Sequence, residues 1–237
     1  MPTLNLLYQR QIKINDDIQV IIPTVGEVID DEDSYYGLVS LLTAMPIDLI
    51  VQLDDAGIDF TQINDYELFL LLFPGIKSQD THLVFGDLNL SEFELATNNQ
   101  NDTVVLWNQN TNVVIDRAIH GQITYALRKI HHLEKNLRKP VNDEVKKYLI
   151  QRARDKQRRR KNRVSESQLE SLIIAMVNAE QYKYDFEGTR ELSIYQFNES
   201  VRQIIKKVDY DNKMFGVYTG NIDSKHLSQD DLNWLTH

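Results

Sequence analysis

The sequence contains no cysteine among its 237 residues. The absence of thiols excludes disulfide frameworks, thiolate nucleophiles and zinc sites with sulfur ligands, and it fits a reducing cytosol. No apolar run reaches the roughly 18 to 20 residues that a membrane-spanning helix needs, and the first residues lack the apolar stretch of a signal peptide. We therefore expect a protein that is neither exported by that route nor held in a membrane.

Catalytic motifs are also missing from the sequence. The nine glycines are scattered, and they form neither a phosphate-binding loop, nor a dinucleotide-binding fingerprint, nor a nucleophile elbow. The acidic runs at residues 30–33 and 54–55 lack the glycine and the terminal glutamate of a calcium loop, so a solvated acidic surface is the favoured interpretation. We expect no enzyme activity and no cofactor.

Histidines are the remaining candidates for metal ligands. His131 and His132 are adjacent on a predicted helix and therefore point apart, His120 is a third candidate, and Glu134 is the carboxylate within reach. His82 and His237 are more isolated. We expect ordinary imidazoles on a helix surface and no metal site.

The charge is unevenly distributed along the chain. Lys and Arg against Asp and Glu number 4 to 19 in residues 1–120, 15 to 4 in residues 121–163 and 7 to 12 in residues 164–237, which gives −15, +11 and −5 and sums to the −9 of the whole chain. This order of acidic, basic and acidic parts bears on partners and solubility rather than on the fold.

Apolar periodicity predicts an α+β protein with a mixed N-terminal domain of short strands and apolar helices, a long basic helix and an all-helical C-terminal domain. The expected domains are an acidic mixed domain over 1–140, a basic helical junction over 141–165 and a helical domain over 166–237. In the first domain we expect a hairpin over residues 8–23, a helix capped by Ser34 with a break near Pro46, and a helix over 66–73 capped by Thr61.

Residues 82–119 show β signals, beginning with HLVFGDLN, and VVLWNQNTNVVID reads as a hairpin. A long helix is expected from about Asp116 until Pro140, and a second helix is expected to begin at Asn142. Thr189 or Ser193 could cap the middle helix of the C-terminal domain.

A basic segment, RARDKQRRRKNR, is the strongest electrostatic signal. Its cations form a basic interaction patch: Arg152, Arg154, Lys156, Arg158, Arg159, Arg160, Lys161 and Arg163. Three interpretations remain open: a solvated or self-neutralised helix, docking on an acidic protein surface of the same chain or of a second subunit, and contact with nucleic acid. Nucleic acid is disfavoured because no aromatic residues interleave with these cations and the rest of the chain is acidic.

Three stretches of the sequence resemble tail assembly chaperones and associated tail-region proteins of long-tailed phages that infect low-GC Gram-positive bacteria. They are PIDLIVQLDDAGIDFTQINDYELFLLLF, the LRKIHHLEKN helix with its basic continuation, and LSIYQFNESVRQIIKKVDYDNKMFGVYTGNID followed by LNWL. The resemblance implies a protein without an active site that coats the tape measure protein while the tail tube assembles. It also implies a location in the host cell cytoplasm, or in the virion if the protein is retained there.

A chaperone of this kind needs a surface for an apolar helix. The candidate partner-binding residues share a place in the predicted C-terminal helices: Ile194, Tyr195, Phe197, Val201, Ile204, Met214 and Phe215. The alternative interpretation is that these side chains form the core of the C-terminal domain. The rival functions are a structural virion protein of the tail or head-tail connector and a nucleic-acid-binding accessory protein. Tape measure or other tail proteins are the expected partners, together with self-association.

Overall fold

The structure is a computed structural model that describes residues 5–98, 102–161, 167–229 and 231–235. Helices predominate, and the strands form two small antiparallel sheets, which confirms the α+β class. Within these ranges no helix combines the length and the apolar character that crossing a membrane requires. The division at residues 140 and 165 stays a prediction.

The elements before the basic junction are, in chain order, β1 (Gln11–Lys13), β2 (Gln19–Ile21), α1 (Val25–Asp30), α2 (Glu32–Thr43), the 3₁₀ helix η1 (Pro46–Leu49), α3 (Ile50–Asp55), α4 (Asp65–Ile76), α5 (His82–Phe85), η2 (Leu90–Glu92), β3 (Glu94–Asn98), β4 (Thr103–Asn108), β5 (Val113–Ile115) and α6 (Arg117–His131). The elements that follow are α7 (Asp143–Lys161), α8 (Gln168–Val177), α9 (Phe186–Glu191), α10 (Ile194–Tyr218) and η3 (Ser224–His226).

The predicted N-terminal hairpin is present as β1 and β2, in which Ile12 pairs with Val20 and both side chains are buried. The helical region after it begins earlier than expected. Thr24 caps α1 by accepting a hydrogen bond from the Glu27 amide, and the Glu27 carboxylate accepts one from the Thr24 amide. This capping box starts α1, and α2 begins directly after it at Glu32 with Asp31 at the N-cap position. Ser34 therefore lies inside the first turn of α2, and the predicted cap is wrong.

Helix α4 is longer at both ends than the sequence indicates. Asn64, not Thr61, caps it, and the helix continues through Pro74. A proline removes one helical N–H donor, but Phe73 and Ile76 on either side of it are buried in the core and keep the chain on the helical path. The predicted stop at Pro74 is therefore wrong.

The segment HLVFGDLN, predicted to be a strand, forms α5 and a turn instead. An apolar run of four residues is too short to distinguish the periodicity of a helix from that of a strand. The Asp80 carboxylate accepts a hydrogen bond from the His82 amide and so favours the helical turn. Gly86 ends the turn with a positive φ of 62°. The next strands agree with the prediction, because β4 and β5 form a hairpin that pairs buried Leu106 with buried Ile115.

Helix α6 begins after its cap Asp116, as predicted, but it ends at His131 rather than near Pro140. His132 adopts the left-handed conformation with φ 53°, which turns the chain out of the helix. The chain then crosses the first part of the molecule, where the Lys135 ammonium bonds the Asp65 carboxylate at 2.7 Å. The predicted continuation of this helix is thus wrong.

One large buried cluster joins the two ends of the chain. It unites side chains from the hairpin, α2, α4, α6 and α8 with Ile194 and Phe197 at the start of α10. A second, smaller cluster lies beside it, formed by Ile50, Val51, Leu53, Phe60 and Leu68 and covered by three side chains of α7. The C-terminal helices therefore share the main core with the acidic first part.

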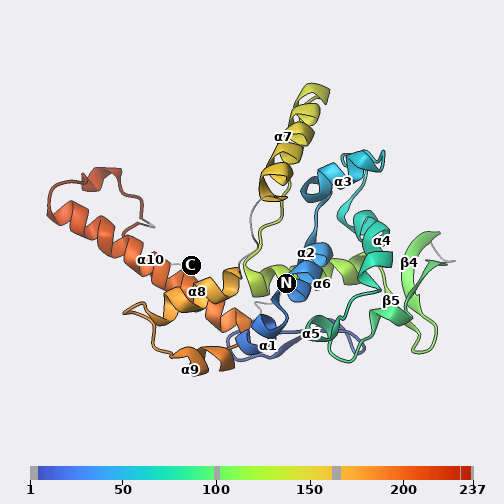
Figure 1. Cartoon of the computed structure of the whole chain (residues 1–237), viewed down its shortest axis with the longest axis horizontal. Coiled ribbons are helices and arrows are strands. Elements are labelled where there is room, and N and C mark those ends of the chain that lie inside the picture. The colour runs from blue at the N-terminus through green and yellow to red at the C-terminus, as the bar shows by residue number, and fades with distance from the viewer. Residues whose placement is uncertain (1–4, 99–101, 162–166, 230, 236–237) are drawn as a thin grey trace.

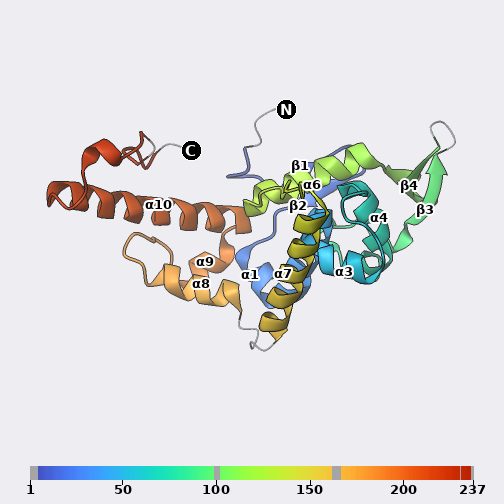
Figure 2. The same ribbon diagram turned by 90° about the horizontal axis from the view of Figure 1, so that it is seen from above.

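Two long helices and a ribbon of strands project from this body. Figures 1 and 2 show α10 running away from the body on one side, the sheet of β3, β4 and β5 on the opposite side, and α7 rising between them beside α3. Projecting elements of this kind expose surface that a partner can contact, so they are candidates for a binding site.

Candidate partner-binding surfaces

The start of α10 is fixed firmly to the body. Ser193 is the N-cap of the helix and forms a capping box with Gln196. Of the two predicted caps, Ser193 is therefore the correct one. Thr189 is buried within α9 instead. The Ile194 amide donates to the Pro23 carbonyl at 2.8 Å, which ties the first turn of α10 to the chain segment before α1.

An apolar stripe runs along α10 with a seven-residue repeat. The repeat places Ile194, Val201, Val208 and Phe215 at one position of the heptad and Phe197, Ile204 and Tyr218 at the next apolar position, where Asp211, paired with Lys207, is the polar interruption. The stripe starts in the core, where Phe197 is 0% exposed, and it leaves the core as the helix projects, so that Phe215 is 69% exposed and Tyr218 87%. Ile205, at the edge of the same stripe, is 61% exposed. An apolar seam that continues past its own core is typical of a helix that packs against another helix.

The end of α10 folds back as a hook on another face of the helix. Gly220, with φ 74°, ends the helix in a Schellman turn in which the Asn221 amide donates to the Gly216 carbonyl. Ile222 then packs on Gly216 so closely that a Cβ there would lie 2.6 Å from the Ile222 side chain. Lys213 bonds Asp231 of the returning segment at 2.5 Å. The hook stiffens the tip while Phe215 stays exposed.

The charged side chains of α10 pair mostly within the arm. Lys207 bonds Asp211, Lys213 bonds Asp209 as well as Asp231, and Arg202 lies 3.7 Å from Glu199. These pairs neutralise each other along the helix. The stripe is therefore apolar with a balanced border, which suits an apolar helix better than a strongly charged partner.

Helix α7 is attached to the body by charges and a small apolar patch. Lys146 Nζ lies 2.6 Å from Asp59 Oδ2, and Arg154 Nη2 lies 2.6 Å from both Asp54 Oδ2 and Asp55 Oδ1. The hydrogen bond from Lys146 lowers the pKa of Asp59 to about 2. The acidic pair at 54–55 thus serves as the anchor for the basic helix, which is a role that the sequence alone does not assign to it.

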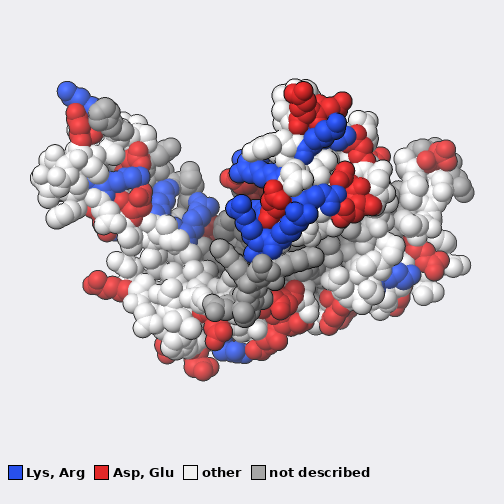
Figure 3. Space-filling model, turned by 45° about the horizontal axis from the view of Figure 1, so that its top comes forward, with Lys and Arg blue, Asp and Glu red and all other residues white. Residues whose placement is uncertain are grey.

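The outward face of α7 holds the remaining described cations of the basic patch. Arg152, Lys156, Arg158 and Arg159 are exposed, and Arg158 lies 3.8 Å from Asp155. Figure 3 shows the blue side chains of this helix as a band bordered by red ones. The side chains of Arg160 and Lys161 and the whole of Arg163 lie outside the described residues. Of the three interpretations of the patch, the structure supports docking on the chain's own acidic surface for Arg154, which bonds Asp54 and Asp55.

The predicted partner-binding residues separate into two groups. Ile194 and Phe197 are fully buried in the main core, as the alternative interpretation predicts, and Tyr195, Val201 and Ile204 are half-buried against it. Met214 is half-buried near the tip, and Phe215 is exposed. The exposed stripe also includes Ile205, Val208 and Tyr218, which are not among the residues predicted to bind a partner. The seven-residue repeat is the signal that could have found them.

The histidines expected on the surface lie mostly inside the fold, so that expectation is wrong. His120 is buried and stacks on Phe69 with ring centroids 4.4 Å apart, and His131 Nε2 lies 2.9 Å from the Tyr35 hydroxyl. Burial lowers the pKa of each of these two histidines to about 4. Among the residues that the structure describes, no three His, Cys, Asp or Glu gather in a way that could hold a metal ion.

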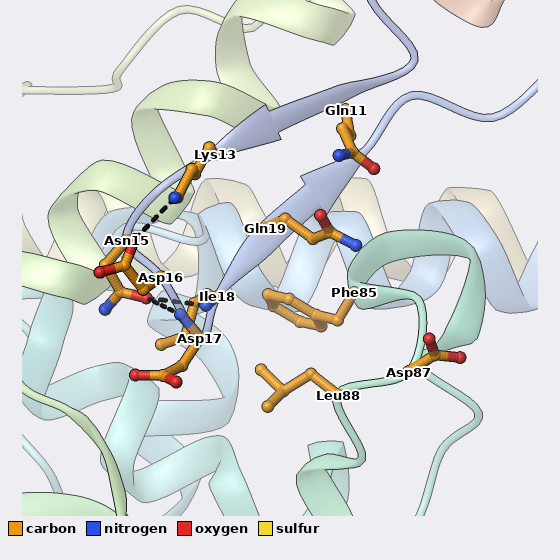
Figure 4. A pocket seen from close by; sticks show the side chains of 10 residues that line it. All are labelled: Gln11, Lys13, Asn15, Asp16, Asp17, Ile18, Gln19, Phe85, Asp87 and Leu88. Atoms are coloured by element: carbon orange, nitrogen blue, oxygen red, sulfur yellow. Dashed lines mark hydrogen bonds and ion pairs between the residues drawn. The ribbon is translucent and has the colours of Figure 1, made fainter.

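A hollow of about 450 Å³ lies beside the N-terminal hairpin. In Figure 4 most of its polar side chains come from β1, β2 and their turn, Asp87 comes from the segment after α5, and Phe85 and Leu88 form an apolar side. Lys13 bonds Asp16 at 2.6 Å, and the Asn15 side chain accepts hydrogen bonds from the backbone of the turn. These polar groups bond to one another or to the backbone of the turn, so they serve to hold the shape of the hairpin.

Comparison with known families gives one match. Residues 158–237 match the family model of the YomV second domain, a phage-associated family typified by YomV of Bacillus phage SPBc2. The match spans about a third of the chain, from the last turn of α7 through the hook of α10. No curated protein and no solved structure matches the chain. The match links this third of the chain to a phage-associated family, and the matched segment contains the projecting α10.

Proposed function

We propose that this phage protein is a non-catalytic tail assembly chaperone that acts in the host cell cytoplasm and binds the tape measure protein through the exposed stripe of α10. The single observation that supports this function best is the heptad seam that leaves the core at Ile204 and stays exposed as far as Tyr218. A tape measure protein is a long helix with apolar stripes, and such a helix aggregates unless its stripes are covered.

The geometry of α10 fits that task. Residues 204–218 extend about 21 Å along the helix at 1.5 Å per residue, which is long enough to cover two heptads of a partner helix. The balanced charges along the border of the stripe tolerate partners of different sequence, because binding rests on apolar contact rather than on a fixed set of ion pairs. The acidic surface of the first part would keep the loaded complex soluble.

The test is a sedimentation assay after co-expression with a tape measure fragment from the same phage. The intact chain should keep the fragment in the supernatant. The variant Ile205→Ser, Phe215→Ser, Tyr218→Ser should let most of the fragment pellet, because all three side chains lie on the exposed stripe. The matched control is Leu71→Ser, Leu95→Ser, Tyr184→Ser, which removes three exposed apolar side chains outside α10 and should keep the fragment soluble.

A fragment that pellets equally with and without the intact chain would overturn the proposal. Retention of the protein in purified particles, measured by mass spectrometry, would instead support a structural component of the virion. Circular dichroism must show that both triple variants remain folded.

A second candidate function is binding to nucleic acid, and the four exposed cations of α7 are the observation that favours it. Tyr148, which is 62% exposed, precedes Arg152 by one turn and could stack on a base. The test measures binding to duplex DNA at 0.15 M salt before and after Arg158, Arg159, Arg160 and Lys161 are replaced by Gln. Tight, salt-sensitive binding that these substitutions abolish would favour this function over the chaperone.

A further inference from the structure

From the contacts of α7 we infer that the surface of α3 is a second helix-docking groove, that α7 occupies it as an exchangeable internal ligand, and that it accepts a basic amphipathic helix of the same pattern from a partner. This groove is separate from the stripe on α10, and the inference does not depend on the function proposed for that stripe.

The groove has an apolar floor with acidic ends. Ile50, Val51, Leu53 and Phe60 belong to the smaller core cluster, and Leu149, Ile150 and Ala153 of α7 cover them. Asp59 lies at one end, where it meets Lys146, and Asp54 and Asp55 lie at the other end, where they meet Arg154. The apolar floor and the acidic ends together fit a helix that carries an apolar face between two cations.

The spacing of the bound side chains defines the ligand. From Lys146, the two large apolar residues follow at three and four positions, Ala153 at seven and Arg154 at eight. Positions three, four and seven apart share one face of a helix, and eight residues extend about 12 Å. A partner helix that carries a cation, an apolar face and a second cation at these positions satisfies the same groove.

The attachment of α7 is weak enough to exchange. Its apolar contribution is three half-buried side chains, and the carboxylates at the rim are 36% to 59% exposed, so water screens each ion pair. The helix also carries nine Lys or Arg against three Asp or Glu over residues 143–161, which disfavours its own helical state. In contrast, the floor residues are almost fully buried and need a cover.

The experiment uses the chain's own helix as the probe. A fluorescent peptide of residues 141–161 is titrated with the full-length protein, and binding is followed by anisotropy. The intact protein should bind it weakly, because its own α7 competes at high effective concentration. The release variant Leu149→Asp, Ile150→Asp, which changes α7 and leaves the groove intact, should bind the peptide at least tenfold more tightly.

Charge reversal then locates the binding. In the release variant, Asp54→Lys with Asp55→Lys should weaken binding at least tenfold, and a peptide with Arg154→Glu should recover much of this loss. The matched control Asp31→Lys with Asp33→Lys makes the same change of net charge on two exposed carboxylates away from the groove, and it should alter binding by less than about threefold because salt screens distant charges.

Equal binding of the peptide to the intact protein and the release variant would overturn the inference. So would an equal loss with the control reversal, which would reveal nonspecific attraction to an acidic protein. If the release variant does not fold, Lys146→Gln with Arg154→Gln is a milder one, because it keeps the apolar contacts, and it should still bind the peptide at least threefold more tightly than the intact protein. Failure of both release variants to gain affinity also overturns the inference, whereas the sedimentation assay on α10 is unaffected by either result.

Discussion

Helices α7 and α10 both project from the body, but they are attached to it in opposite ways. Helix α10 begins in the main core with Ile194 and Phe197, and its exposed surface is an apolar stripe. Helix α7 touches a smaller apolar cluster with three side chains, and ion pairs hold it at Lys146 and Arg154. Burial of apolar surface resists salt, whereas exposed ion pairs do not, so the two arms should respond to different conditions.

This difference also separates the roles that the two helices can have. A helix rooted in the core can present a surface to a partner without leaving its place, as the chaperone proposal requires of α10. A helix held by screened charges can exchange with a competitor, as the inference about α3 requires of α7. Four predictions test the contrast, from the largest expected effect to the smallest.

The largest effect is expected at the root of α10. Phe197→Ala removes a ring that is 0% exposed and leaves a cavity in the main core beside the Tyr182 ring, so the free energy of unfolding should fall by about 3 to 5 kcal/mol. Urea denaturation measures this loss. The corresponding change on α7, Ile150→Ala, removes a half-buried side chain from the smaller cluster and should cost clearly less. Equal losses would show that the two helices are attached with similar strength.

Acid should weaken the body before it weakens the attachment of α7. Burial lowers the pKa of His120 and His131 to about 4, against about 6.5 in an unfolded chain. Between these values the unfolded chain takes up protons that the folded protein does not. The contribution of these two histidines to the free energy of unfolding is therefore fully present above pH 6.5 and falls as the pH drops toward 4, at about 1.4 kcal/mol per pKa unit for each histidine.

The Lys146–Asp59 pair should survive this range, since the pKa of Asp59 is about 2. Urea denaturation between pH 7.5 and 4.5 measures the effect. His120→Phe should flatten the pH dependence, because Phe keeps the stacking on Phe69 and cannot be protonated. The exposed His82, replaced by Gln, is the control. A dependence that His120→Phe leaves unchanged would contradict the assignment for that histidine.

A feature of this fold was predictable from the sequence when it depends on residues that are close together in the chain. The α+β class, the hairpin at β4 and β5 and the cap at Asp116 follow from local patterns, and the structure confirms them. The end of α6 and the burial of His120 and His131 do not, because they depend on contacts with Tyr35 and Phe69 from distant parts of the chain.

The candidate site was predictable to a similar extent. Phe215 and the basic helix stand out in the sequence, but a helical apolar pattern does not show where the core stops. Ile194 and Phe197 therefore look the same in the sequence as Ile205, which is 61% exposed. The carboxylates of Asp54 and Asp55 could be recognised as an acidic pair, but their partner Arg154 lies about a hundred residues away in the chain.

Salt should loosen α7 and leave the first turns of α10, which are rooted in the core, unchanged. Raising NaCl from 0.1 to 1 M shortens the Debye length from about 10 to 3 Å and screens the exposed pairs of Lys146 and Arg154. Amide hydrogen exchange in α7 should accelerate severalfold, while the first turns of α10, rooted in the core, should keep their protection. Exchange followed by mass spectrometry measures both helices at once. Acceleration in both would indicate that salt destabilises the whole fold.

The smallest effect on the free energy of unfolding is expected for substitutions on the exposed stripe of α10. Phe215 and Tyr218 are 69% and 87% exposed, so replacing both by Ser removes little buried area and should change the free energy of unfolding by less than about 0.5 kcal/mol. Large apolar side chains that contribute so little to the fold are free to serve another purpose. A loss above about 1.5 kcal/mol would show that these side chains support the hook or the helix itself, and the stripe would then be part of the fold rather than a surface for a partner. Gly216→Ala is the matched comparison, since the added Cβ would press on Ile222 and disturb the hook directly. If Gly216→Ala destabilises the protein and the double serine variant does not, the two faces of the arm have separate roles, with one holding the hook and the other left open for a helix.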